Sequence, residues 1–197
     1  MNQYFEENNN LKTEEKLITI RYKEKKYKFH TSNAVFSKDK FDYGSKILLE
    51  TITENKLTGK VLDLGCGYGV IGLLLATTNP NLSIDMVDIT DRAIELSKKN
   101  AHSLNLNNAN IFKSNIYEQV SDRYNYIITN PPIRAGKDII RKFLIGAKEH
   151  LEPKGELWFV MRKEHGVKSM IKELEEYYLV EIKTKSKGFF IVKCQVK

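Results

Sequence analysis

A glycine-rich turn near residue 65 is the first place in the sequence where residue types and spacing could support chemistry. Asp63 lies in a short apolar run typical of a buried strand, and the turn after it holds three glycines at alternate positions, Gly65, Gly67 and Gly69. A helical pattern follows over Val70–Ala76. Glycines let the backbone approach a ligand closely, and a strand that passes through such a turn into a helix is a nucleotide-type binding device. We therefore expect the turn to bind a ligand of that type.

The spacing of these residues narrows the choice of ligand. A dinucleotide-binding fingerprint, G-x-G-x-x-G, would place its third glycine at residue 70, which is valine. The order found here, D-x-G-x-G-x-G, resembles the first motif of class I S-adenosylmethionine-dependent methyltransferases. The resemblance implies S-adenosyl-L-methionine as the cofactor and five residues in its binding: Asp63, Gly65, Cys66, Gly67 and Gly69. The alternative is a glycine-rich turn in another Rossmann-like protein.

The ends of the next two predicted strands carry further polar side chains. In open parallel sheets, ligands bind beyond the carboxyl ends of the strands. Asp88 stands at such an end, 23 residues after the first glycine, which is close to the spacing at which an acid accepts from ribose hydroxyls. Asp85 is the alternative candidate for this contact with ribose, but it lies in the middle of the strand. Ile89 is placed to lie against adenine, although a core isoleucine would have the same pattern.

Asn115 follows the third predicted strand, at a place where many methyltransferases have an aspartate. Its amide oxygen would accept from the adenine amino group; the alternative is an asparagine that only forms the loop.

Two consecutive prolines follow the apolar segment 124–129. They fix the backbone and remove N–H donors, which leaves carbonyl oxygens that can point into a cleft, with the Asn130 amide oxygen beside them. The order Asn130-Pro131-Pro132 resembles the Asn-Pro-Pro motif of amino-group methyltransferases that act on adenine N6, guanine N2 or glutamine. The simpler alternative is a diproline turn between a strand and a loop.

The resemblance to the Asn-Pro-Pro motif implies a catalytic role for these three residues. An exocyclic amine is a weak nucleophile because its lone pair is delocalised into the ring or carbonyl. Two acceptors, the Asn130 side chain and the Pro131 carbonyl, would bind its hydrogens and hold the nitrogen towards the sulfonium methyl, with Asn130 also bordering the cofactor. Such positioning can contribute ~7–11 kcal/mol. No strong general base is then required, and the sequence offers no obvious Ser/His/Asp or paired-carboxylate set.

The residues around this motif narrow the substrate. Adenine and glutamine enzymes commonly have an aromatic residue after the prolines, whereas this chain has isoleucine and arginine. Together with the upstream segment 35–45, this order resembles the small methyltransferase domain of ribosomal RNA guanine-N2 methyltransferases, over roughly residues 16–197. The resemblance implies three substrate-binding residues: Phe36, Ile133 and Arg134. It also implies that two others border the cofactor or target pocket: Asp42 and Gly44.

Regularly alternating strands and helices after residue 60 must position these side chains. Strand patterns cover five segments: 61–64, 83–88, 109–112, 124–129 and 156–161. Helical patterns lie between and after them: 91–104, 139–151 and 166–176. Hairpin patterns stand at both ends: 17–22 with 27–30, and 178–184 with 189–196. Alternation predicts an α/β fold with a mostly parallel sheet. It resembles the Rossmann-like, seven-stranded methyltransferase architecture, with an antiparallel last strand and helices on both faces, preceded here by a small N-terminal β-hairpin.

Length, composition and charge limit the number of domains, the location and the class of partner that we expect. At 197 residues we expect a flexible lead over 1–15 and a single methyltransferase domain over 16–197. No apolar run approaches the ~18 residues of a membrane helix and the start has no signal-peptide core, so we expect a cytoplasmic protein. Two cysteines make neither a disulfide framework nor a metal site. The net charge of +7 supports a nucleic-acid partner, but a general bias of the composition towards lysine would also explain part of it.

The sequence thus predicts a methyltransferase that moves a methyl group from S-adenosyl-L-methionine to guanine N2 in ribosomal RNA of the 16S type. The expected partner is ribosomal RNA or the small ribosomal subunit, with no membrane and no metal. One alternative is an N-methyltransferase acting on adenine, a protein glutamine or a small molecule. Another is a non-catalytic RNA-binding module on the same fold.

Overall fold

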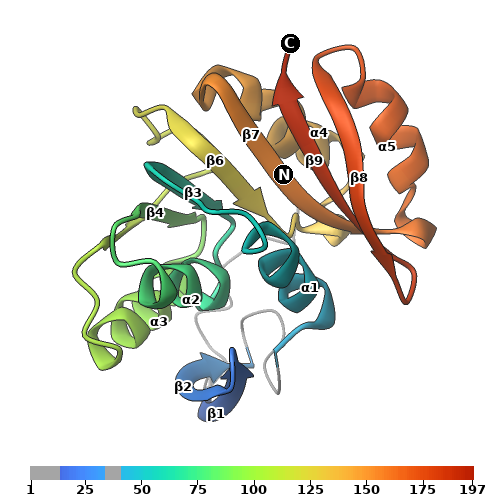
Figure 1. Ribbon diagram of the computed structural model, residues 1–197. Coiled ribbons are helices and arrows are strands. Elements are labelled where there is room, and N and C mark those ends of the chain that lie inside the picture. Colours follow the sequence, from blue (N-terminus) through green and yellow to red (C-terminus); the bar gives the residue numbers. More distant parts are fainter. Residues whose placement is uncertain (1–13, 34–40) are drawn as a thin grey trace.

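A seven-stranded sheet forms the centre of the computed structural model, which describes residues 14–33 and 41–197 (Figure 1). Its strands lie in the order β5-β4-β3-β6-β7-β9-β8. Their bounds are β3 Lys60–Leu64, β4 Ser83–Asp88, β5 Ala109–Lys113, β6 Tyr124–Thr129, β7 Leu151–Arg162, β8 Tyr178–Ser186 and β9 Phe189–Val196. β9 is antiparallel to both of its neighbours, and the other pairs are parallel. This confirms the predicted Rossmann-like sheet with an antiparallel last strand.

Helices cover both faces of the sheet because its central strands are apolar on both sides. One face packs against α1 (Tyr43–Ile52), α2 (Val70–Thr78) and α3 (Asp91–Ser103), and the other against α4 (Lys137–Gly146) and α5 (Val167–Leu174) (Figure 1). α2 is buried from its first residue through Ala76, as its uninterrupted apolar sequence predicts. α3 is amphipathic and begins after Thr90, whose hydroxyl accepts from the Ala93 N–H. Among the helices described, none is long and apolar enough to cross a membrane.

The predicted N-terminal hairpin is present as β1 (Glu15–Tyr22) and β2 (Lys25–Ser32). It packs against the face that carries α1 to α3, with Ile20 and Phe29 in the shared core (Figure 1). Asn100 of α3 joins it to the rest of the domain: its Oδ1 accepts from the His30 N–H at 2.7 Å, and its Nδ2 donates to the carbonyls of His30 and Tyr68, both at 2.9 Å. The division into a lead and a domain remains a prediction.

The largest difference from the predicted element bounds lies between α4 and β7. The helix expected over 139–151 is α4 followed by a 3-10 turn at Ala147–His150, and β7 begins at Leu151 rather than at residue 156. β7 includes the segment Pro153-Lys154-Gly155, because its pairing with β6 shifts in register between the pairs Tyr124–Leu151 and Tyr126–Glu156. Such an irregularity keeps the strand paired while it accommodates residues that cannot continue the ladder.

Candidate active site

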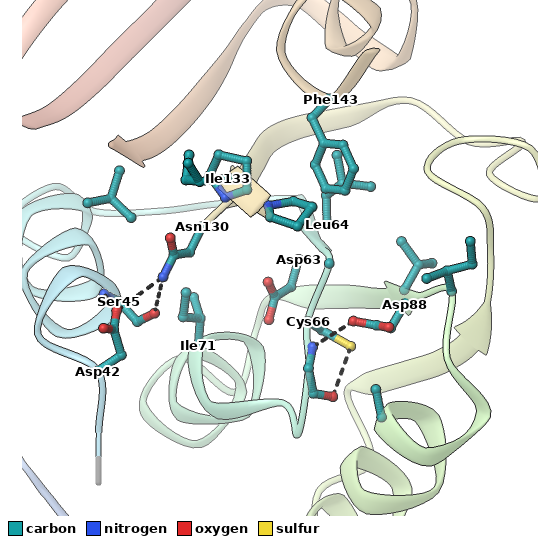
Figure 2. Close-up of a pocket in the computed structure, with 18 of the residues that line it drawn as sticks. Asp42, Ser45, Asp63, Leu64, Cys66, Ile71, Asp88, Asn130, Ile133 and Phe143 are labelled. Carbon is teal, nitrogen blue, oxygen red and sulfur yellow. Dashed lines mark hydrogen bonds between the residues drawn. The ribbon is translucent and has the colours of Figure 1, made fainter. Parts of the chain in front are cut away.

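A cavity of about 700 Å³ lies at the carboxyl edge of the parallel strands (Figure 2). Residues that end or follow β3 to β7 line it, because parallel strands bring their carboxyl ends to one edge of the sheet. β9 runs in the opposite direction, so its first residue, Phe189, reaches the same edge. The start of α1 contributes Asp42 and Ser45.

The cavity brings together most of the residues singled out in the sequence. Thirteen of them line it: Asp42, Asp63, Gly65, Cys66, Gly67, Asp88, Ile89, Asn115, Asn130, Pro131, Pro132, Ile133 and Arg134. Gly44, beside Asp42, is not among the lining residues. Gly69 does not line it but begins α2 in a left-handed conformation. Phe36 lies outside the described residues. The grouping is therefore an observation, while the individual roles remain predictions.

The glycine loop is tied to the end of β4. The Gly65 and Cys66 N–H groups both donate to the Val87 carbonyl at 2.9 Å, and the Gly67 N–H donates to Asp88 Oδ2 at 3.0 Å. Gly67 has φ of 58°, and a Cβ built on it would meet no atom within 4 Å, so the space beside it is open to a ligand. Burial raises the pKa of the Cys66 thiol, which therefore stays neutral as a small lining group.

Asp63 is a buried carboxyl group in the floor of the cavity. It is 1% exposed, and its Oδ2 accepts from the Gly72 N–H at 2.8 Å, which ties β3 to the first turn of α2. Burial raises the pKa of Asp63 to about 7, the charge of Asp88 adds to the rise, and the Gly72 hydrogen bond opposes it. A positively charged ligand placed nearby would favour the ionised form.

We predict that the stability of the protein falls, relative to an Asp63→Asn variant, as pH rises from about 5 to 7. Because the folded-state pKa of Asp63 is about 7 and its ordinary value is 3.8, the folded protein holds a proton that the unfolded chain has released in this interval. The wild type therefore loses stability with rising pH, and the loss is complete above about pH 8. The asparagine of the variant keeps an acceptor for the Gly72 N–H but cannot ionise. Denaturant unfolding of both proteins between pH 5 and 8 measures the difference; a gap that stays constant would show that Asp63 is already ionised at pH 5.

The two acids of β4 have different environments. Asp88 Oδ1 accepts from the backbone N–H and the hydroxyl of Thr90, both at 3.0 Å, and the carboxylate faces the cavity (Figure 2). Asp85 is a buried mid-strand residue that accepts from the Tyr124 hydroxyl at 2.7 Å and from Asn110 Nδ2 at 3.0 Å. Asp88 lines the cavity and Asp85 does not, and the contact of Asp88 with ribose remains a prediction.

Asn115 lies in the loop after β5, at the cavity wall. Its Nδ2 donates to Glu118 Oε1 at 2.6 Å, and its backbone N–H donates to Gln119 Oε1 at 3.3 Å. Because the amide nitrogen is held by Glu118, the amide oxygen is the end that a ligand could use. This orientation suits the predicted acceptor role without testing it.

The Asn-Pro-Pro turn is held from both sides. The Thr129 hydroxyl donates to the Leu64 carbonyl at 2.8 Å, which fixes the end of β6 beside β3. Asn130 Nδ2 donates to Asp42 Oδ2 at 3.1 Å and to Ser45 Oγ at 2.9 Å (Figure 2). The Pro132 carbonyl accepts from the Ala135 N–H at 2.9 Å within a 3-10 turn. The Asn130 amide oxygen is thus the end of the amide left to the cavity, and Pro131 is one of the residues that line it.

Several lining residues were not predicted as site residues from the sequence. Phe189 packs its ring 5.7 Å from the Tyr43 ring, centroid to centroid, and the Arg162 guanidinium lies 5.1 Å from its centroid. Ser45, Tyr68 and His165 also line the cavity. The sequence signal for Arg162 and His165 is their position at and just after the end of β7, and the signal for Phe189 is its position at the start of an antiparallel strand.

The site suits S-adenosyl-L-methionine. It combines a glycine loop that has open space at Gly67 with two acidic side chains, Asp63 and Asp88, that suit a positively charged nucleoside, and with an apolar wall. Groups of three or more His, Cys, Asp or Glu side chains that could hold a metal do not occur among residues 14–33 and 41–197.

A Rossmann-like sheet with this loop, this β4 carboxylate and an Asn-Pro-Pro turn at one cavity defines a class I methyltransferase fold. The chain belongs to the methyltransferase small domain family, whose model matches residues 26–193. A similar fold is found in the solved structure of the Thermus thermophilus 16S rRNA N2 G1207 methyltransferase RsmC in complex with AdoMet and guanosine. That structure matches with a TM-score of 0.83 and 24% identity, covering 93% of this chain and 51% of the other.

Related sequences differ in how much of their length this chain spans. The uncharacterized protein YbxB of Bacillus subtilis is 37% identical over 195 residues, which are 98% of this chain and 97% of YbxB. The ribosomal RNA small subunit methyltransferase C of Psychromonas ingrahamii is 32% identical over 167 residues, which are 83% of this chain but 47% of that protein. The chain therefore spans less than half of this methyltransferase C.

Proposed function

We propose that this protein is a cytoplasmic enzyme that transfers a methyl group from S-adenosyl-L-methionine to the exocyclic N2 of guanine in ribosomal RNA of the small subunit. The orientation of the Asn130 amide carries the proposal, because its nitrogen is held by Asp42 and Ser45 and its oxygen is left to accept from a substrate amine in the cavity. The names of the methyltransferase C relative and of the Thermus enzyme support the choice of guanine in 16S-type RNA.

Residues of β3, β4 and β5 would hold the cofactor. The glycine loop would let the cofactor lie close to the backbone at Gly67. The Asp88 carboxylate would accept from the ribose hydroxyls, and Ile89 and Asn115 would contact the adenine. Asp63 would favour the positively charged methionine end. The cofactor supplies an electrophilic methyl group on a sulfonium.

Residues of β6 would hold the guanine. The two amine hydrogens would donate to the Asn130 amide oxygen and the Pro131 carbonyl, so that the nitrogen lone pair would face the methyl group. In the transfer a nitrogen–carbon bond would replace the sulfur–carbon bond of the donor, and the nitrogen would release one proton to solvent. Positioning of this kind can lower a barrier by ~7–11 kcal/mol, which makes a strong base unnecessary.

Basic and aromatic residues around the cavity suit an RNA substrate. Arg134, Arg162 and His165 line it, and Lys187 lies 4.7 Å from the Tyr43 ring centroid beside the start of α1. Together with the net charge of +7, these side chains would contact phosphates and bases around the target guanine.

Mass spectrometry of nucleosides from small-subunit ribosomal RNA tests the proposal in cells. We expect a strain that lacks the gene to lose one N2-methylguanosine and to regain it with the wild-type gene. Loss of N6-methyladenosine would identify an adenine enzyme. Unchanged ribosomal RNA would overturn the proposal and favour a small-molecule or protein substrate, or a non-catalytic module.

A further inference from the structure

We propose that Asp42 and Ser45, at the start of α1, are positioning residues that fix which end of the Asn130 amide faces the substrate. The inference deepens the proposed function, on which it rests for the identity of the substrate. Its evidence is the pair of hydrogen bonds that join α1 to the end of β6 across 85 and 88 residues of sequence.

The two ends of an asparagine amide have almost the same shape but opposite hydrogen-bonding character. An ionised aspartate can only accept, so the group that Asn130 presents to Asp42 must be its NH₂. Nδ2 lies 3.1 Å from Asp42 Oδ2 and 2.9 Å from Ser45 Oγ. The amide oxygen then points away from both residues, into the cavity (Figure 2). With the amide turned over, two donors would face each other at the substrate amine, and the acceptor would be lost.

The Asp42 carboxylate is itself held in place by α1. The same Oδ2 atom accepts from the Ser45 N–H at 2.8 Å as the N-cap of the helix. Gly44 permits this close packing: a Cβ built there would lie 2.9 Å from Phe189 Cε1 and 3.1 Å from Asp42 Oδ2. The order Asp42-Tyr43-Gly44-Ser45 thus has a physical reason, because one turn of helix supplies the cap and both acceptors for Asn130.

Variants of Asp42 and Ser45 separate this role from helix capping. Asp42→Ser keeps an N-cap oxygen but is too short to reach Asn130. We expect the single-turnover methyl-transfer rate to fall about 10- to 100-fold, the range for a lost hydrogen bond to a charged group. Ser45→Ala, which loses a neutral partner, should cost about 10-fold or less. Cofactor affinity should stay within about twofold in both. In an Asn130→Ala background, Asp42→Ser should have no further effect on the rate.

A reciprocal exchange provides a rescue. Asn130→Asp alone places two carboxylates against each other and should be nearly inactive. Adding Asp42→Asn restores a donor facing an acceptor, and the double variant should exceed the single variant by about 10-fold or more. Rate losses of Asp42→Ser and Asn130→Ala that simply multiply, or an exchange with no recovery, would overturn the proposal.

NMR of the protein without substrate gives an independent readout. The side-chain NH₂ signals of Asn130, identified by their loss in Asn130→Ala, should be protected from hydrogen exchange in the wild type and lose that protection in Asp42→Ser. Unchanged signals would overturn the positioning role. If the signals change as expected but the wild type methylates no ribosomal guanine, the positioning role stands and the proposed substrate is wrong; the rate comparisons are then made on the substrate that is methylated.

Discussion

Replacing Asn130 with alanine is expected to slow methyl transfer to ribosomal RNA by on the order of 10²–10³-fold while cofactor affinity stays within about twofold. The loss of one preorganised polar group at a reacting centre typically has this effect on rate. The cofactor is expected to be unaffected because the proposed contacts to adenosine come from β3, β4 and β5, whereas Asn130 follows β6. Single-turnover kinetics and calorimetry on the same preparations measure the two quantities.

The matched control is Asn107→Ala, which removes an exposed asparagine away from the cavity. It should leave rate and affinity unchanged. Wild-type turnover in a folded Asn130→Ala variant would contradict the assigned role, and an equal loss of cofactor affinity would place Asn130 in the cofactor site instead.

Replacing Asp88 with alanine is expected to weaken cofactor binding by about 100-fold or more. A hydrogen bond to a charged group is worth roughly 1.5–3 kcal/mol, and two ribose hydroxyls would lose their acceptor. The same change removes the acceptor for the Gly67 N–H at 3.0 Å, so the glycine loop also loses its tie to β4. Calorimetry with S-adenosyl-L-methionine gives the affinity, and thermal unfolding reports any loss of stability.

Asp91→Ala is the control for Asp88. Asp91 lies three residues further along, at the start of α3, pairs with Lys113 at 2.8 Å and does not line the cavity. Its removal lowers the local negative charge without touching the proposed ribose site, so affinity should change little. Equal losses in both variants would mean that net charge rather than ribose binding accounts for the effect of Asp88.

Local sequence patterns were sufficient to predict the sheet and most of the cavity. Buried parallel strands are short, continuous apolar runs, and their carboxyl ends meet at one edge, so Asp63, Asp88 and Asn130 could be placed together because each lies at or next to the end of such a run. The antiparallel last strand was predicted from resemblance to a known architecture. The extent of β7 was not predicted, because its proline and glycine are typical of a turn and the register shift depends on pairing with β6.

The contacts that orient the site had no local signal. Asp42 and Asn130 are 88 residues apart, and the packing of α1 against β7, β9 and α2 brings the helix start to the end of β6. Arg162 and Phe189 reach the cavity from strands predicted mainly as structural elements. The hydrogen bond from the Ala135 N–H to the Pro132 carbonyl likewise had no signal in the sequence analysis.

Identification of the labelled nucleoside is the most direct test of the central claim. Purified protein is incubated with small-subunit ribosomal RNA from a strain that lacks the gene, both as free RNA and as assembled subunits, and with methyl-labelled S-adenosyl-L-methionine. After digestion to nucleosides, we expect label in N2-methylguanosine, and almost none when Asn130→Ala replaces the wild type. Label in N6-methyladenosine, in ribosomal protein, or in no product despite measured cofactor binding would contradict it.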